Sequence, residues 1–106
     1  MQALLDLTRL SGYPGFPARA IIRKGEKVSG YDANETVRID GEMDKIWYTP
    51  KDHPDIYCKG DTSSDELDGH YFSFYVYFSY VADAAEKREI ATVCRSITDN
   101  LLRNDY

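Results

Sequence analysis

The sequence predicts a mainly α-helical protein, in which an antiparallel helical hairpin over 63–103 follows an N-terminal helix and a long loop. Two capping signatures, Ser63-x-x-Glu66 and Asp83-x-x-Glu86, each precede a long run that no proline interrupts. Apolar residues recur at helical spacing in both runs. All 4 prolines lie between the two helical regions. We therefore divide a single domain, or a fragment of one, into a helix over 1–12, a loop with short strands over 13–60, and the hairpin.

The first helix is indicated by leucines at helical spacing, namely Leu4, Leu7 and Leu10. Gly12 and Pro14 then end it. The chain begins inside this pattern with no capping residue ahead of it, which suggests that an upstream part is missing.

The segment 13–60 is predicted to be largely irregular. Residues 18–24 form a short strand anchored by Ile21 and Ile22. Residues 36–40 and 45–49 are predicted to pair as a hairpin around Gly41. An irregular stretch of this length is typical of a functional loop or a lid.

The next helix, over about 64–82, carries seven of the chain's fourteen aromatic residues. Its period predicts a core-facing stripe of Leu67, Tyr71, Phe74, Phe78 and Val81. Phe72, Val76 and Tyr80 point the opposite way. A helix that is apolar on nearly all sides belongs inside a larger body or at an interface. We therefore expect a homo-oligomer or a larger helical partner.

The last helix is the most regular. One apolar stripe runs along it, formed by Ile90, Val93, Cys94, Ile97 and Leu101. Cys94 is thus interpreted as a small core residue, and Cys58 as a loop residue. A disulfide between these two cysteines remains an open alternative.

Charge and hydropathy narrow the function classes. A formal net charge of −5 disfavours nucleic acid and anionic membranes as partners, because both select basic surfaces. No apolar run approaches the ~20 residues of a membrane span, and the first residues lack a signal-peptide pattern. The chain as written is expected in the cytoplasm, or in the periplasm or outside the cell if it is a piece of a longer precursor.

Acidic residues crowd the start of the aromatic helix, at Asp61, Asp65, Glu66 and Asp68. They have two interpretations: helix capping with dipole compensation, or the carboxylate pair of a glycoside hydrolase. Glu66 and His70 stand four residues apart, as two metal ligands do, but no third ligand has supporting spacing, so we expect no metal. No phosphate loop or CxxC motif occurs, and we expect no cofactor.

Two segments carry a family resemblance: GYPGFPARAIIRKGE, and KGDTSSDELDGHYFSFYVYFSYVAD with the EKREI and ITDNLLRNDY that follow it. They resemble the bacterial helical-toroid proteins, which are six-hairpin, (α/α)-barrel and glycosidase-like. The resemblance covers 1–28 and 57–106, and it implies a slice of an (α/α) toroid. It also implies that Asp65 and Glu66 are the matching catalytic positions. The candidate residues for contact with carbohydrate are Asp61, His70 and Tyr71, and also Trp47, an aromatic residue outside the two matching segments.

Two functions follow as hypotheses. Three helices are far fewer than a toroid contains, so the isolated chain is expected to lack catalysis and to associate through its aromatic helix. The alternative is a sugar-binding or sugar-hydrolysing domain that uses the carboxylates at the start of that helix. Aromatic side chains serve both as sugar platforms and as core, and we favour core for those on the helix. Trp47, in a polar loop, leaves both open.

Overall fold

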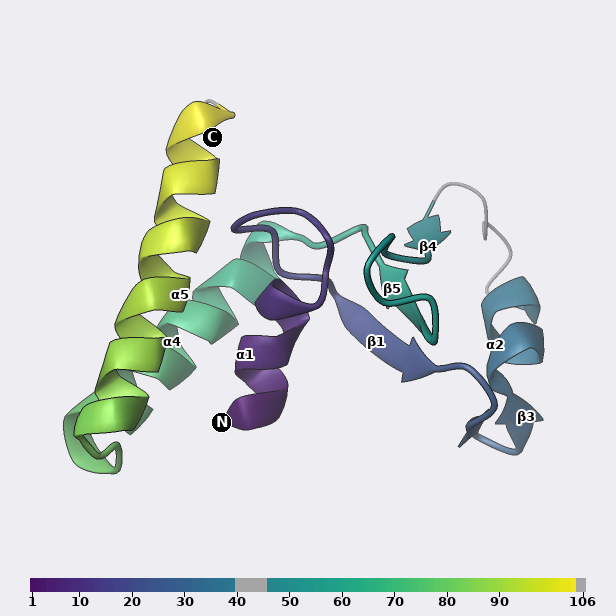
Figure 1. Ribbon diagram of the computed structural model, residues 1–106, viewed down its shortest axis with the longest axis horizontal. Coiled ribbons are helices and arrows are strands. Elements are labelled where there is room, and N and C mark those ends of the chain that lie inside the picture. The colour runs from purple at the N-terminus through teal and green to yellow at the C-terminus, as the bar shows by residue number, and fades with distance from the viewer. Residues whose placement is uncertain (40–45, 105–106) are drawn as a thin grey trace.

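The computed structural model describes residues 1–39 and 46–104, and Figure 1 shows two ends of different character. One end holds the helices α1 (Gln2–Arg9), α4 (Ser64–Tyr80) and α5 (Ala84–Arg103). The other holds the helix α2 and short strands. The described part is therefore helix-rich with a small antiparallel sheet. The bounds at the second end are β1 Ala20–Arg23, β2 Lys27–Val28, β3 Tyr31–Asp32, α2 Ala33–Ile39, β4 Trp47–Tyr48 and β5 Ile56–Lys59.

The helical end matches the prediction of an N-terminal helix and a capped hairpin. Asp83 starts α5 because its side chain accepts a hydrogen bond from the Glu86 N–H (2.8 Å), while Glu86 accepts one from the Asp83 N–H (3.2 Å). The predicted stripe of α5 faces α4 and α1, and its central residues are buried. The core at this end consists of Leu5, Phe74, Ile90, Val93 and Ile97.

The predicted core stripe of α4 is confirmed for Phe74, which is buried, and for Leu67 and Tyr71, which pack against the core, but it is wrong for the rest of the helix. Phe78 and Val81 are exposed, whereas His70 is buried with 5% of its surface accessible. Compared with the prediction, the buried side of α4 is shifted around the helix toward the flank that carries Glu66, His70 and Tyr77. A helix that is apolar on every side has no contrast between its faces, so its period does not fix which side turns inward.

The sheet has the order β1-β5-β4, and both of its pairings are antiparallel. Ile22 faces Tyr57 across β1 and β5, and Tyr48 faces Cys58 across β4 and β5. The strand predicted at 18–24 is thus present as β1. A separate pair, β2 and β3, forms a tight hairpin.

The predicted hairpin over 36–40 and 45–49 is wrong where the structure describes it. Residues 36–39 belong to α2, and β4 pairs with β5 instead; residues 40–45 lie outside the described part. The helix forms because Asp32 caps it, accepting a hydrogen bond from the Glu35 N–H (2.8 Å). Ala33 and Val37, one helical turn apart, are fully buried and hold it against the sheet.

The stretch 13–60 is therefore less irregular than predicted, because it has a core of its own. Ile22, Ala33, Val37 and Trp47 form one buried cluster, and Ala18, Ile56 and Cys58 form another. Cys58 lies in β5 rather than in a loop, and its thiol donates to the Leu10 carbonyl (3.8 Å). Both cysteines are free thiols.

Candidate functional site

Most of the exposed large apolar side chains in the described part of the chain lie on the outer side of α4 and at its C-cap, a surface that we call the aromatic face. It consists of Phe72, Tyr75, Val76, Phe78, Tyr80 and Val81. Phe72 is 70% exposed and Tyr80 is 79% exposed, so no described segment of the chain covers them. Residues 69–82 include no Asp, Glu, Lys or Arg. The face therefore carries none of these charged side chains, and its polar groups are the tyrosine hydroxyls and the exposed Ser79.

An apolar groove of about 290 Å³ lies between α4 and α5, beside the aromatic face. At its border the Lys87 ammonium stands 5.3 Å from the centre of the Phe78 ring. The Tyr71 and Thr98 hydroxyls are joined by a hydrogen bond (2.8 Å). Burial raises the pKa of the Cys94 thiol in the groove, which keeps it protonated and apolar in character. The lining residues are Tyr71, Phe74, Tyr75, Phe78, Ile90, Ala91 and Cys94.

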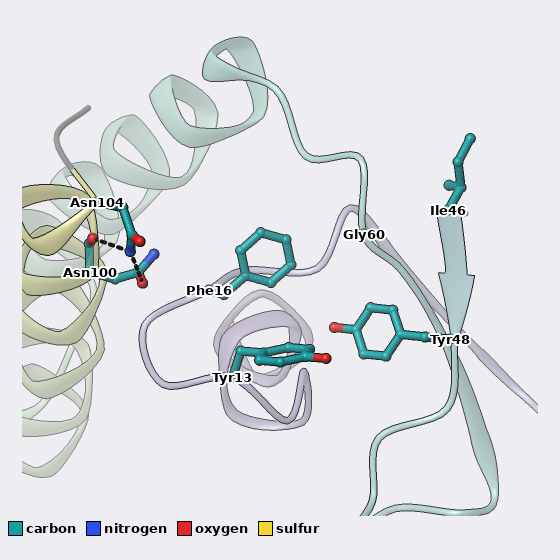
Figure 2. Close-up of a pocket in the computed structure, with 7 residues that line it drawn as sticks. All are labelled: Tyr13, Phe16, Ile46, Tyr48, Gly60, Asn100 and Asn104. Carbon is teal, nitrogen blue, oxygen red and sulfur yellow. Dashed lines mark hydrogen bonds between the residues drawn. The ribbon is translucent and has the colours of Figure 1, made fainter. Parts of the chain in front are cut away.

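A second hollow, of about 390 Å³, lies where the turn after α1, the sheet and the end of α5 meet (Figure 2). We call it the aromatic cleft. Tyr13 meets Tyr48 edge to face, with ring centres 5.6 Å apart, and it meets Phe16 in the same way at 6.3 Å. The cleft thus offers ring faces on one side and amides on the other. Its lining residues are Tyr13, Phe16, Ile46, Tyr48, Gly60, Asn100 and Asn104.

Hydrogen bonds to other residues of the chain fix the polar groups of the aromatic cleft. The Tyr48 hydroxyl donates to the Ser11 carbonyl (2.7 Å), and burial raises the pKa of this phenol, so it stays neutral. The Asn104 amide donates to the Asn100 carbonyl oxygen (2.9 Å) and to the Asn100 side-chain oxygen (3.0 Å). The two asparagines therefore form a joined polar rim, seen opposite the rings in Figure 2.

The carboxylates at the start of α4 are engaged by Arg19. Its Nε lies 2.9 Å from Glu66 Oε1, and its Nη1 lies 3.3 Å from Asp61 Oδ2. The other oxygen of Glu66 accepts from the Ser63 N–H (3.0 Å), as a helix cap does. Asp65, the residue that precedes Glu66 in the helix, is exposed. Both oxygens of Glu66 thus have structural partners, and the arrangement favours the capping interpretation.

The structure separates the other predicted contact residues. His70 is buried, its ring edge-on to Phe74 (5.8 Å between centres), and its Nδ1 has no hydrogen-bond partner among the described residues. Desolvation lowers its pKa, and nearby Glu66 opposes this to a smaller degree. Trp47 is buried in the core at the sheet end rather than lying in a polar loop, while Tyr71 is half-buried at the helical end. Their elements, β4 and α4, lie at different ends of the molecule (Figure 1).

Residues 13–16 and 100–104 were not predicted as a site. The turn GYPGFP already showed two aromatic residues among turn formers, which is a usable signal. Asn100 and Asn104, however, stand more than eighty positions later in the chain, and no spacing connects them with that turn. Only the packing of the turn against α5 brings the two parts together.

In the described part of the chain, no cluster of three or more metal-ligating side chains occurs. None of its helices combines the length and the apolar character that crossing a bilayer requires. Comparisons with family models, curated proteins and solved structures found no match to this chain.

Proposed function

We propose that the chain is a helical interaction protein, without catalysis on its own, that associates with another protein surface through the aromatic face of α4. The observation that carries the proposal is the exposure of Phe72, Val76 and Tyr80, which residues 1–39 and 46–104 leave to solvent. The resemblance to six-hairpin proteins agrees with a partner that is helical too, either a second copy or a larger helical protein.

The size of the aromatic face supports association. An aromatic side chain offers about 150–250 Å² when fully exposed, so the four partly exposed aromatic residues and the two valines present on the order of 600 Å² together. This is at the upper limit of the patches that typical monomers expose. Burying it against a matching surface is worth on the order of 15 kcal/mol from each side, or about 30 kcal/mol in all. The opposing costs are about 4–15 kcal/mol for association, together with the ordering of the interface side chains and the desolvation of the tyrosine hydroxyls, so only part of this gain appears as affinity. The balance favours association.

Sedimentation velocity over a range of concentrations tests the proposal. The wild-type chain is expected to shift toward larger species as the concentration rises into the micromolar range and above. Phe72→Ser combined with Tyr80→Ser should abolish the shift. Leu102→Ser is the matched control, because Leu102 is 73% exposed but lies near the far end of α5. A wild-type chain that stays monomeric at every concentration would overturn the proposal.

A second candidate function is sugar binding, and the aromatic cleft favours it. Its volume of about 390 Å³ suits a small ligand. Ring faces pack against the apolar faces of sugars, and the paired amides of Asn100 and Asn104 provide hydrogen bonds for hydroxyl groups. Calorimetric titration with oligosaccharides should give heat with the wild type and none with Tyr13→Ala. Equal heats for both proteins would remove this candidate.

The enzymatic form of the sugar-binding hypothesis is hydrolysis of a glycosidic bond by Asp65 and Glu66. A glycoside hydrolase needs two carboxyl groups about 5–9.5 Å apart on either side of the scissile bond. The ion pair of Glu66 with Arg19 supports a cap instead. Asp65→Asn and Glu66→Gln should therefore leave any hydrolysis of oligosaccharides unchanged, and a loss of activity in both variants would restore the catalytic interpretation.

A further inference from the structure

We infer that the partner of the aromatic face is a second copy of this chain, and that the two α4 helices pack antiparallel about a two-fold axis near Val76. This inference rests on the proposed function above. It adds the identity of the partner, the direction of the helices and the contacts at their ends. Three properties of the described surface carry it: the charges, the shape and the area.

The charges favour antiparallel over parallel packing. Asp65 and Asp68 are exposed at the start of α4. At its other end Lys87 borders the groove, and the exposed Asp83 is held by the start of α5, where its side chain accepts from the Glu86 N–H. In an antiparallel pair the acidic start of each α4 lies at the same end of the dimer as the Lys87 of the second copy, twice per dimer. A parallel pair would instead bring acidic residues beside acidic ones and Lys87 beside Lys87, which is repulsive. The helix dipoles also favour the antiparallel direction.

The shape is self-complementary. The aromatic face projects rings, and the adjoining groove of about 290 Å³ between α4 and α5 is open and apolar. A two-fold axis turns the same patch of each copy toward the other, so that each copy presents rings and each offers a groove. Because each surface both projects and receives apolar groups, two copies of this chain can cover each other without a different protein.

The area fits a weak dimer. If each copy buries on the order of 600 Å², the interface totals about 1,200 Å², which is the lower limit for specific interfaces. The rings at its centre would be the main contributors, because Tyr, Trp and Arg dominate the energies of interfaces. Since residues 69–82 carry no Asp, Glu, Lys or Arg, burying them leaves no such charge unpaired in the middle.

Substitutions that reverse the charge at either end of α4 test the antiparallel arrangement of the dimer. Asp65→Lys with Asp68→Lys, and separately Lys87→Glu, are expected to raise the dimer dissociation constant about threefold to tenfold, because each puts like charges together at both ends. The combination of all three substitutions should return the constant close to the wild-type value. Asp52→Lys with Asp55→Lys, at exposed positions of the loop between β4 and β5, is the matched control for the net charge of the double Asp→Lys variant.

Cross-linking gives a second readout that does not depend on charge. A residue on a two-fold axis meets its own copy, so Val76→Cys in a Cys94→Ser background should form a disulfide-linked dimer under mild oxidation. Thr92→Cys in the same background, an exposed position that lies in another hollow of the surface, should stay monomeric. Thermal unfolding of each variant shows whether it remains folded.

The outcomes separate the inference from the proposed function. Restored dimerisation together with the Val76→Cys cross-link supports both. Association that persists without rescue and without the cross-link overturns the antiparallel dimer and leaves the proposed function standing. Binding only to a larger helical protein overturns the second copy as the partner. A monomer that binds nothing through α4 overturns both.

Discussion

The helices α4 and α5 form one hairpin, yet they differ in how much of their apolar surface is buried. They are 17 and 20 residues long, and each has a Glu at its third position whose side chain accepts from the N–H of the residue before the helix. In α5, Ile90, Val93 and Ile97 are buried and charged residues occupy much of the opposite side. In α4 aromatic residues continue around the whole circumference. The apolar stripe of α5 is covered by its own chain, whereas α4 has more apolar surface than the described part of the chain covers.

This difference teaches that a strong cap and a long helix do not guarantee a closed core. Near its start α4 is anchored by the ion pair of Glu66 with Arg19, and farther along the Tyr77 hydroxyl donates to Glu86 of α5 (2.5 Å). These contacts fix its inner side. They contribute nothing to the outer side, where the exposed rings remain. Comparing an inner ring with an outer ring therefore measures the two sides separately.

The largest expected effect is on the inner side of α4. Phe74 is 1% exposed, and Phe74→Ala should lower the free energy of unfolding by about 3–5 kcal/mol because it leaves a cavity in the core. Phe72→Ala, on the same helix but exposed, should change it by less than about 0.5 kcal/mol. Urea unfolding of dilute protein measures both. Similar losses for the two variants would mean that Phe72 is already covered in the monomer.

The next largest expected effect on the free energy of unfolding is at Gly15, where the turn after α1 packs against α5. Gly15 has a φ of +72°, and a Cβ there would stand 2.0 Å from the Ser96 carbonyl oxygen of α5. Gly25 has a φ of +89°, but a Cβ there would meet nothing within 4 Å. Gly25→Ala should cost about 1–2 kcal/mol from its backbone alone. Gly15→Ala should cost about 1–3 kcal/mol more, because the turn must move off the helix.

Gly15→Ala should also disturb the aromatic cleft, since Tyr13 and Phe16 flank the displaced residue. The heat of sugar binding, if the wild type shows any, should fall with Gly15→Ala and remain with Gly25→Ala. Equal unfolding energies for the two variants would mean that the turn does not rest on α5 as the structure has it.

The sequence predicted much of the helical end, because its signals are local. Capping residues, helical spacing and the Gly–Pro turn act within one or two turns of the chain. The helix α2 was missed although Asp32 and Glu35 have the same capping spacing and Ala33 and Val37 share a face. The turn-rich sequence around them and the β-branched Thr36 and Val37 favoured a strand instead.

The other features of the fold and of the candidate site could not be predicted from the sequence, because they depend on packing between segments that are distant in the chain. The rotation of α4 is set by α1 and α5, not by its own period. Trp47 sits among polar neighbours in the sequence, yet β4 pairs with β5 and turns its ring into a core. The aromatic cleft needs the turn at 13–16 beside the end of α5. In each case the deciding contact joins residues that no local pattern relates.

The smallest effect concerns His70, which has no counterpart on α5. Burial lowers its pKa below the ordinary 6.5, so the folded protein keeps the ring neutral while the unfolded chain takes up a proton near that value. The unfolded state thus binds more protons below about pH 6.5, and stability should fall as the pH falls, by at most about 1.4 kcal/mol per pH unit. Above that pH the group contributes no pH dependence.

His70→Leu removes this titration, and urea unfolding of both proteins between about pH 8 and pH 5 isolates it as a difference. The difference between the two free energies should be constant above about pH 6.5 and should shift in favour of the variant below it. Other groups titrate in both proteins and cancel. Parallel curves throughout would mean that His70 reaches a partner for its proton, and then the inner side of α4 would be less closed than the core of α5.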